Sequence, residues 1–114
     1  MIRKSLVPNL KNRRLKKKKT VALRPNFDLK STDNLGGGFR RLVFTDVQIE
    51  PNSFLEITIN SGNRKVVSGG WSIANFQKAF AIESYPRQIN QWVISVFNDT
   101  SVTRSITPYL ITKA

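Results

Sequence analysis

Apolar and polar residues alternate along most of the chain after residue 39, which is the period of a half-buried β-strand. In the clearest stretch, Leu55, Ile57 and Ile59 alternate with polar neighbours. Residues 92–97 are apolar on both faces and indicate a central strand. Turn residues separate such segments at about ten-residue intervals, which predicts an all-β fold, a small antiparallel β-sandwich or jelly roll.

In the first half of the alternating region, the sequence predicts three strands and one hairpin. Residues 42–49 alternate so that Val43, Val47 and Ile49 share a face. The loop 60–63 is typical of a short hairpin, so we expect residues 64–68 to return as the partner of 55–60. The double glycine that follows, Gly69-Gly70, should end that strand.

In the second half, residues 72–82 fit both helical and strand spacing, and we expect a strand at 78–84 with a connection at 74–77. Tyr85-Pro86-Arg87 is typical of a turn. Because proline cannot donate to a sheet ladder, Pro108 predicts an edge or bulge between strands 103–107 and 109–112.

Positive charge is concentrated before the alternating region. The first 24 residues hold ten Lys/Arg and no acid, whereas the other ninety hold nine Lys/Arg and seven Asp/Glu. This asymmetry predicts three parts: an extended basic arm at 1–24, a connector at 25–38 that ends in a flexible triple-glycine joint, and the sandwich at 39–114. The arm's cations are Arg3, Lys4, Lys11, Arg13, Arg14, Lys16, Lys17, Lys18, Lys19 and Arg24.

Composition argues against catalysis. The chain has no Cys and no His, so the commonest general base and the commonest transition-metal ligands are missing. Its seven acids form no recognisable acid–base or metal-binding motif, and we expect no enzyme activity, no metal and no cofactor. No stretch approaches the ~20 apolar residues of a membrane span, and Pro8 interrupts the short apolar run that a signal peptide would need.

The arm has three interpretations. Its cations can contact the phosphates of a nucleic acid, with binding that weakens steeply as salt rises. Alternatively the arm docks in an acidic groove of a partner protein, or it only improves solubility. The apolar residues Leu6, Val7, Leu10 and Leu15 favour a protein groove, because a segment that binds only phosphate does not need them.

Two groups of aromatic residues are candidates for surface roles. Trp71, Trp92, Phe97 and Tyr109 could form a base-stacking platform, although the alternation around Trp92 favours a place in the core. Phe39, Phe44 and Phe54 fall on the opposite face from their strands' best apolar positions. They are therefore either a second core face or, with Arg40 and Arg41, an interface.

Four segments resemble a family pattern. They are Val66-Val67-Ser68-Gly69-Gly70-Trp71-Ser72-Ile73, Glu83-Ser84-Tyr85-Pro86, Gln91-Trp92-Val93-Ile94-Ser95-Val96-Phe97-Asn98 and Ile106-Thr107-Pro108-Tyr109-Leu110-Ile111. Over residues 64–112 the chain resembles small all-β modules of tailed-phage virions, such as head decorations and fibre or tail-tip domains. Many such modules carry a Cys near the last strand, where this chain has Thr112. The resemblance implies a structural or adhesive module, often oligomeric, without a cofactor.

We therefore expect a non-enzymatic virion structural protein, a capsid decoration, minor structural or fibre-attachment component, anchored by its basic arm. Its partners would be other virion proteins with an acidic surface or groove, together with copies of itself, for example in a trimer. It would reside in the virion after assembly in the host cytoplasm, without membrane contact. The alternative is a nucleic-acid-binding structural protein, a ribonucleoprotein component or small coat protein. We also expect that removing residues 1–24 leaves a folded domain.

Overall fold

The chain folds as an all-β sandwich, which confirms the predicted fold class. A computed structural model describes residues 18–74 and 77–114. Its elements are β1 (Lys18–Leu23), α2 (Pro25–Asp28), β2 (Leu29–Gly36), β3 (Phe39–Phe44), β4 (Val47–Ile49), β5 (Ser53–Asn60), β6 (Lys65–Ile73), β7 (Phe80–Gln88), β8 (Gln91–Asn98) and β9 (Arg104–Lys113).

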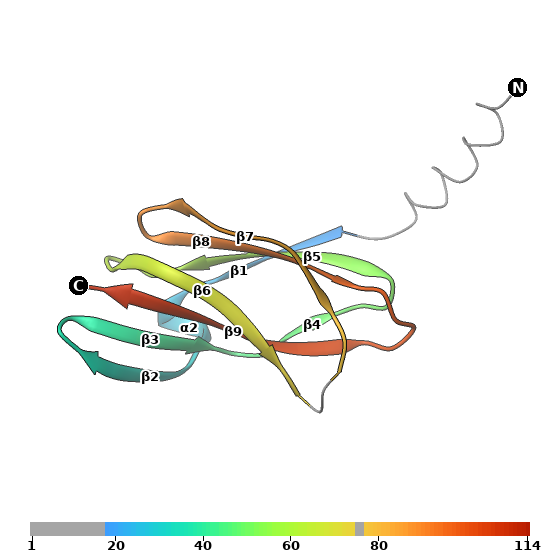
Figure 1. The fold of residues 1–114 in the computed structure, drawn as a ribbon, viewed down its shortest axis with the longest axis horizontal. Helices are drawn as coiled ribbons and strands as arrows, with labels where there is room; N and C mark the ends of the chain where they lie inside the picture. Colours follow the sequence, from blue (N-terminus) through green and yellow to red (C-terminus); the bar gives the residue numbers. More distant parts are fainter. Residues whose placement is uncertain (1–17, 75–76) are drawn as a thin grey trace, which may run out of the picture.

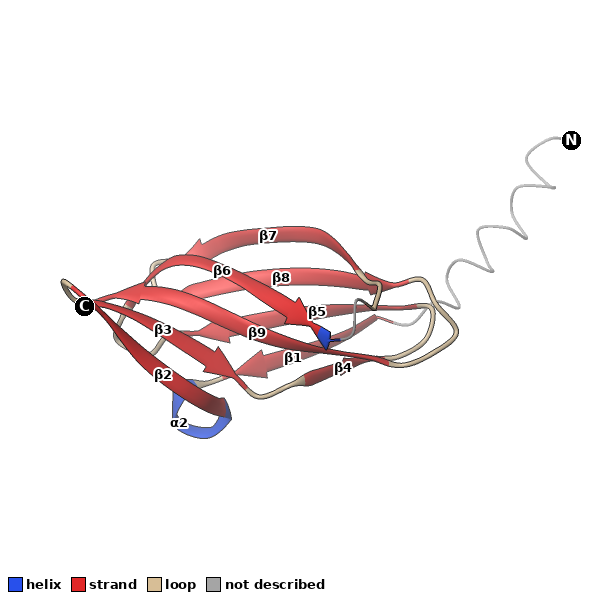
Figure 2. Cartoon of the chain, turned by 60° about the horizontal axis from the view of Figure 1, so that its bottom comes forward, coloured by secondary structure: helices blue, strands red, loops and turns tan. Residues whose placement is uncertain are grey.

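Two sheets form the layers of the sandwich (Figure 1). Sheet A has four strands in the order β1-β5-β8-β7. Sheet B has five strands, in which β3 and β4 pair with one edge of β9 and β6 pairs with its other edge. Figure 2 brings sheet B forward, with β2, β3, β9 and β6 side by side. Every pairing is antiparallel except that of β1 with β5.

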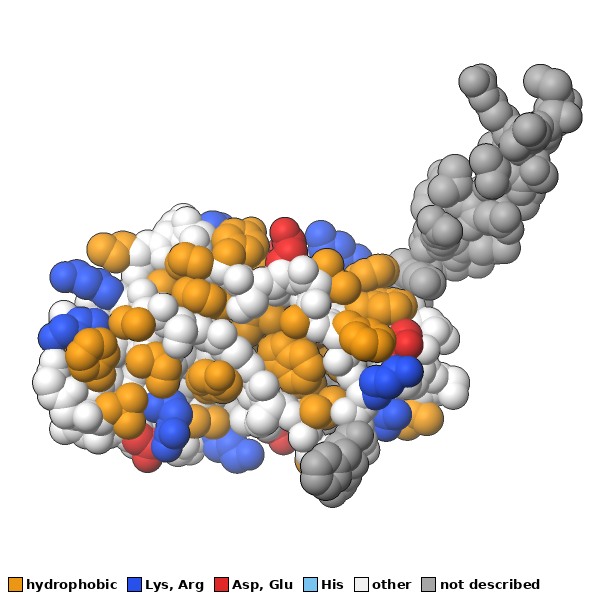
Figure 3. All heavy atoms as spheres, viewed as in Figure 1, with side chains coloured by type: hydrophobic (Ala, Val, Ile, Leu, Met, Phe, Trp, Pro, Cys, Tyr) orange, Lys and Arg blue, Asp and Glu red, His pale blue; other side chains and the backbone are white. Residues whose placement is uncertain are grey.

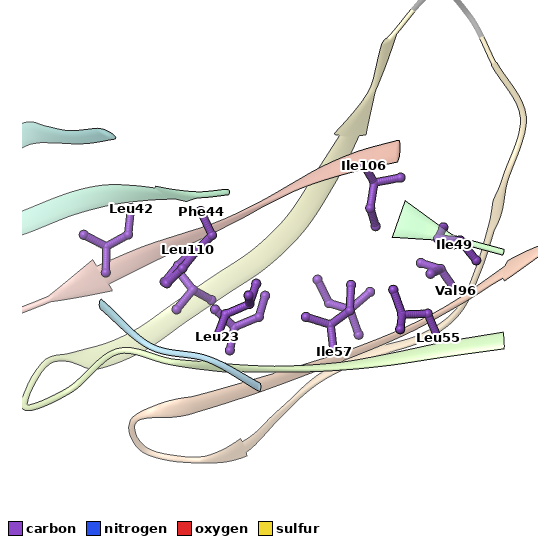
Figure 4. Packing of buried hydrophobic residues seen from close by; sticks show 11 residues of the cluster. Leu23, Leu42, Phe44, Ile49, Leu55, Ile57, Val96, Ile106 and Leu110 are labelled. Carbon is purple, nitrogen blue, oxygen red and sulfur yellow. The ribbon is translucent and has the colours of Figure 1, made fainter. Parts of the chain in front are cut away.

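The core lies between the sheets and consists of aliphatic side chains with Phe44 (Figure 4). Leu55, Ile57 and Ile59 of β5 are at most 2% exposed, which confirms the face predicted from their alternation. Sheet B contributes Leu42, Phe44, Ile106 and Leu110 from the opposite side. Full burial of such a side chain is worth about 1.5–3 kcal/mol, so these contacts dominate the stability of the sandwich.

The expected arm is too long at its C-terminal end. Residues 18–23 form β1, which pairs in register with residues 54–59 of β5. Leu23 is only 3% exposed and belongs to the core. Lys18 and Lys19 are mostly exposed on this strand, where water solvates their charge, and they pair with Glu56 and Glu50. Residues 18–23 are therefore part of the sandwich.

The expected connector at 25–38 is also part of the fold. It contains the single turn of α2 and the strand β2, which pairs antiparallel with β3. Gly36, Gly37 and Gly38 have φ angles of +88°, +62° and +85°, so they form the tight turn between β2 and β3. These left-handed angles explain the three glycines, which are a hairpin turn and not a flexible joint.

The face predicted for residues 42–49 is wrong at its N-terminal half. Leu42 and Phe44 point into the core and are at most 4% exposed, whereas Val43 lies on the other face. The sheet ladder breaks between β3 and β4, where the Thr45 amide donates to the Asp28 carbonyl at 2.8 Å. The break separates two short strands, so a single alternation through residue 45 does not hold.

Strand β6 does not pair with β5, contrary to the predicted hairpin. It crosses to sheet B and pairs with β9 along its length. Gly69-Gly70 does not end the strand either. A Cβ on Gly69 would lie 2.5 Å from the Trp92 ring, and one on Gly70 would lie 2.6 Å from the Tyr109 hydroxyl. Each glycine therefore makes room for an aromatic ring on one face of the strand.

Two prolines lie inside strands where we expected a turn and a strand boundary. Pro86 is within β7, which continues to Gln88, and a register shift follows the proline. Pro108 is within β9 and is buried. On one side of β9, β4 pairs up to Ile106 and β3 begins at Tyr109, so Pro108 falls in the gap between them. A missing amide donor costs least at such a gap. The predicted connection at 74–77 lies partly outside the described residues.

Asn98 connects two loops at one end of the sandwich. Its side chain is 0% exposed, and its Nδ2 donates to the carbonyls of Ile49 at 3.0 Å and Val102 at 2.8 Å. Its Oδ1 accepts from the backbone N and Oγ1 of Thr100 at 3.0 and 2.6 Å. The buried side-chain amide of Asn98 therefore provides hydrogen-bond partners for groups in both loops.

We expect Asn98→Ala to lower the free energy of unfolding by about 2–3 kcal/mol, because buried carbonyls lose their donor. Urea denaturation followed by tryptophan fluorescence measures the change. Asn63→Ala, in an exposed turn, is the matched control and should change the free energy by less than about 0.5 kcal/mol. Equal effects of the two substitutions would contradict the role assigned to Asn98.

The two ends of the described chain lie at opposite ends of the sandwich. β1 begins at the end where β5 begins, and β9 finishes beside the β2–β3 turn, where the Ala114 amide donates to the Gly38 carbonyl at 2.9 Å (Figure 1). Among the residues that the structure describes, no helix has the length and apolar character needed to cross a membrane.

Candidate functional site

A row of three phenylalanines crosses the outer face of sheet A. The strand registers place Phe54 of β5 beside Phe97 of β8, and Phe97 beside Phe80 of β7. The Phe54 and Phe97 rings stack with centroids 4.5 Å apart and an interplanar angle of 26°. Phe80 is 46% exposed, so the row reaches solvent at β7. We call Phe54, Phe97 and Phe80 the aromatic row.

Strand β7 extends this apolar surface to the edge of the sheet. All nine of its residues are exposed, and Ile82 is 54% exposed. In Figure 3 hydrophobic side chains are spread over the face on which β6 and β7 lie in front. Exposed apolar clusters of this kind mark interaction surfaces more often than isolated apolar residues do.

The basic N-terminal segment joins the fold at the other end of the aromatic row. Lys18 is the register partner of Phe54, so the row runs from Lys18 through the three rings. A shallow hollow of about 310 Å³ lies beside it, with Lys18, Phe54 and Ile82 in its lining. Glu56 in the same lining lies 3.8 Å from both Lys18 and Arg87, which balances its charge.

The predicted arm residues divide between two regions. Lys18, Lys19 and Arg24 are in the described part of the chain and make intramolecular contacts. The two lysines form the ion pairs with Glu56 and Glu50, and the Arg24 guanidinium lies 4.6 Å above the Phe27 ring. The other predicted cations, Arg3, Lys4, Lys11, Arg13, Arg14, Lys16 and Lys17, lie outside the described residues.

The predicted interface residues do not form one surface. Phe54 belongs to the aromatic row on sheet A, whereas Phe39 and Arg41 lie on the outer face of sheet B. Arg40 is exposed near the N-terminal end of β3. Arg41 pairs with Asp33 at 3.0 Å. Phe44 is 0% exposed, so its prediction as an interface residue is wrong and its alternative place in the core is correct.

The base-stacking candidates are also separated. Trp71 and Trp92 are partly buried and pack against the core, which agrees with the inward position preferred for Trp92. Trp92 Nε1 donates to Ser84 Oγ at 2.8 Å. Phe97 and Tyr109 lie on the outer faces of different sheets. Phe80 was not among the residues predicted for a surface role from the sequence. Its alternation with Ile82 indicated only that the two side chains share one face of a strand.

Acids offset more than half of the positive charges of the sandwich, and none of those of the N-terminal segment. Residues 18–114 contain 12 Lys/Arg and 7 Asp/Glu, whereas residues 1–17 contain seven Lys/Arg and no acid. Six ion pairs connect strands or loops of the sandwich. In the described ranges, no group of three or more His, Cys, Asp or Glu could hold a metal ion.

The fold and this surface define a small two-sheet β-sandwich whose N-terminal edge strand continues from a strongly basic segment. The YjdH family model matches residues 19–112, so the chain belongs to the YjdH family. The match runs from β1 to β9 and thus includes the strand that the sequence prediction had placed in the arm. No curated protein and no solved structure matches the chain.

Proposed function

We propose that this YjdH-family chain is a non-enzymatic structural protein that is anchored to a larger assembly by its basic N-terminal segment. The observation that carries the proposal is the unbalanced charge of residues 1–17, which continue directly into β1 at the end of the aromatic row. A partner with an acidic surface beside an apolar patch would contact both features together. Electrostatic complementarity would orient the docking and apolar burial would stabilise it.

The assembly we propose is a virion, and its support is the resemblance of residues 64–112 to small modules of tailed-phage particles. The partners are other virion proteins. The chain resides in the virion, which is assembled in the host cytoplasm, and copies of the chain associate, for example as trimers. The exposed apolar side chains of β7 are suited to such subunit contacts, because their burial removes apolar area from water.

The test is incorporation of full-length and altered chains into assembled particles, measured by immunoblot after sedimentation from cells that express the chain natively. Deleting residues 1–17 should reduce incorporation at least about tenfold, since most of the net charge is removed. Phe80→Ala should also reduce it, whereas Phe39→Ala, 37% exposed on the other sheet, is the matched control. Particles that retain the truncated chain at normal occupancy would refute the anchoring role.

The second candidate is a nucleic-acid-binding structural protein, which the same seven cations favour because no acid interrupts them. Fluorescence anisotropy with an oligothymidylate at increasing salt separates the two. Binding by phosphate contacts weakens with a log–log slope of about −0.7 per neutralised phosphate on single strands. Tight, salt-sensitive binding that is lost on deletion of residues 1–17 supports this candidate, and weak binding supports the protein partner.

A further inference from the structure

A second concave surface lies on the outer face of sheet B, on the opposite side of the sandwich from the aromatic row. The groove has a volume of about 490 Å³, and its lining residues belong to β3, β9 and β6. Figure 2 shows these three strands side by side. That volume falls within the ~300–1,000 Å³ typical of small-molecule sites. None of the groove's lining residues belongs to the aromatic row.

The strand registers arrange the groove in rows of side chains. Arg41, Ile111 and Ser68 form one row, and Val43, Tyr109 and Gly70 form the next. Thr107 and Ser72 continue the pattern on β9 and β6. The residues on β6 are small while their neighbours on β3 and β9 are larger, so the surface is hollowed over β6.

Tyr109 provides a flat aromatic surface in this groove. A Cβ on Gly70 would lie 2.6, 2.8 and 3.0 Å from the Oη, Cζ and Cε2 atoms of Tyr109. The outer end of the ring therefore rests against the Gly70 backbone, where any other residue would push it away. Packing of an aromatic ring over a cross-strand glycine holds the ring against the sheet. Tyr109 is half-buried and lines the groove.

The polar groups around Tyr109 are mostly hydroxyls. Thr107 donates to Asp46 at 2.6 Å, whereas the hydroxyls of Ser68, Ser72 and Tyr109 make no hydrogen bond within the described part of the chain. Hydroxyls both donate and accept, so they suit a ligand that itself presents hydroxyls. The lining has no Asn or Gln side chain, and its one Arg, Arg41, is paired with Asp33 at 3.0 Å, so few groups are available to read the edge of a base.

One end of the groove is cationic. In the adjacent row, Lys65 of β6 and Lys113 of β9 are cross-strand partners, so two cationic residues lie at this end. Within the described residues neither forms an ion pair, although Lys113 Nζ donates to the Gly37 carbonyl at 2.7 Å and lies 5.1 Å above the Phe39 ring. The neighbouring Arg64 is engaged with Thr112 and Gly38. An anionic group bound at this end could accept charge-assisted hydrogen bonds from these ammonium groups.

We infer that the groove binds a saccharide that carries an acidic group, a carboxylate or a phosphate. The apolar C–H face of a sugar ring would stack on Tyr109, and its hydroxyls would bond to Ser68 and Ser72. The acidic group would lie near Lys65 and Lys113. This binding site is separate from the anchoring segment and the aromatic row, so it extends the proposed function and does not depend on it.

The test is binding of the full-length chain, at physiological salt, to an array of uronate oligosaccharides, phosphomannose oligosaccharides and the neutral counterpart of each. We expect binding to one acidic class, and the two arms distinguish a carboxylate from a phosphate. Binding to neither acidic class, or equal binding to the neutral sugars, overturns the inference. Competition by uridine monophosphate but by no sugar would also overturn it, since it would indicate a nucleotide site.

Because residues 1–17 are themselves cationic, the variants separate the groove from simple charge attraction. Ser72→Trp fills the groove and keeps every charge, and it should weaken binding at least about tenfold. Ser101→Trp places the same ring in an exposed turn and should bind normally. Lys65→Gln should weaken binding more than Lys17→Gln, which removes the same charge from the N-terminal segment. Unchanged binding by Ser72→Trp, with a normal unfolding curve, contradicts a site in the groove.

Discussion

Deletion of residues 1–24 will strongly destabilise the sandwich, and will lower its free energy of unfolding far more than deletion of residues 1–17. The longer deletion removes β1, its ladder with β5 and the buried side chain of Leu23. It also removes the Leu23 carbonyl that accepts a hydrogen bond from Asn60 Nδ2 at 3.1 Å. Truncating one buried leucine to alanine costs about 2–5 kcal/mol, and loss of the whole strand will cost more.

A domain of this size has a total stability of about 5–10 kcal/mol, so the longer deletion will leave it largely unfolded at room temperature. Urea denaturation, followed by the fluorescence of Trp71 and Trp92, measures both truncated chains against the full chain. If the two deletions are equally stable, β1 contributes nothing and the sandwich begins after residue 24. The particle experiment above uses the shorter deletion for this reason, because that chain keeps β1 and its urea denaturation curve shows whether it is folded.

Phe44→Ala will be the most destabilising single substitution that we predict, at about 3–5 kcal/mol, because its ring is completely buried and its removal leaves a cavity between the sheets. The comparison is Phe54→Ala, whose ring is half-buried on the outer face of sheet A. There the loss is the stacking contact with Phe97 and part of the apolar burial, about 1–2 kcal/mol.

Urea denaturation of the two variants decides between core and surface for these phenylalanines. A larger cost for Phe54→Ala than for Phe44→Ala would show that the two faces have been assigned the wrong way round. Incorporation into particles gives the complementary measurement, since only Phe54 belongs to the aromatic row. We expect Phe54→Ala to reduce incorporation while the chain stays folded.

Strands β5 and β8 could be predicted from the sequence because each has uninterrupted alternation or a continuous apolar run between clear turns. Their central positions in sheet A agree with those patterns. In β3 the same reasoning chose the wrong face, whereas in β4 Val47 and Ile49 do face the core, because the chain breaks its ladder at residues 45–46 and one alternation cannot describe both strands. Alternation is informative only within a strand whose ends are known.

The pairing of β6 and the reason for its two glycines could not be predicted, because both depend on residues that are distant in the sequence. A four-residue loop after β5 fits a hairpin, but it also fits a crossing to the other sheet, as β6 makes. Gly69 and Gly70 resemble strand breakers until Trp92 and Tyr109 are placed against them. The need for glycine at these positions comes from aromatic rings on two other strands, and local propensity contains no information about those neighbours.

The candidate site was predictable only in part. The charge of the N-terminal segment is a property of composition and could be recognised directly, whereas its boundary could not, because Lys18 and Lys19 are paired with acids about 30 or more residues away. The aromatic row depends on the registers of β5, β8 and β7 together. Phe54 could be proposed for a surface from its alternation, but its neighbours Phe97 and Phe80 could be identified only after the strands were aligned.

The parallel pairing of β1 with β5 places Lys18 and Ala114 at opposite ends of the sandwich, and this has a practical consequence for engineering. A fluorescent protein or antigen fused after Ala114 would project away from whatever the N-terminal residues hold. The same cargo fused before residue 1 would be next to the proposed attachment point. The C-terminus is therefore the position from which this chain could display foreign sequences on a scaffold.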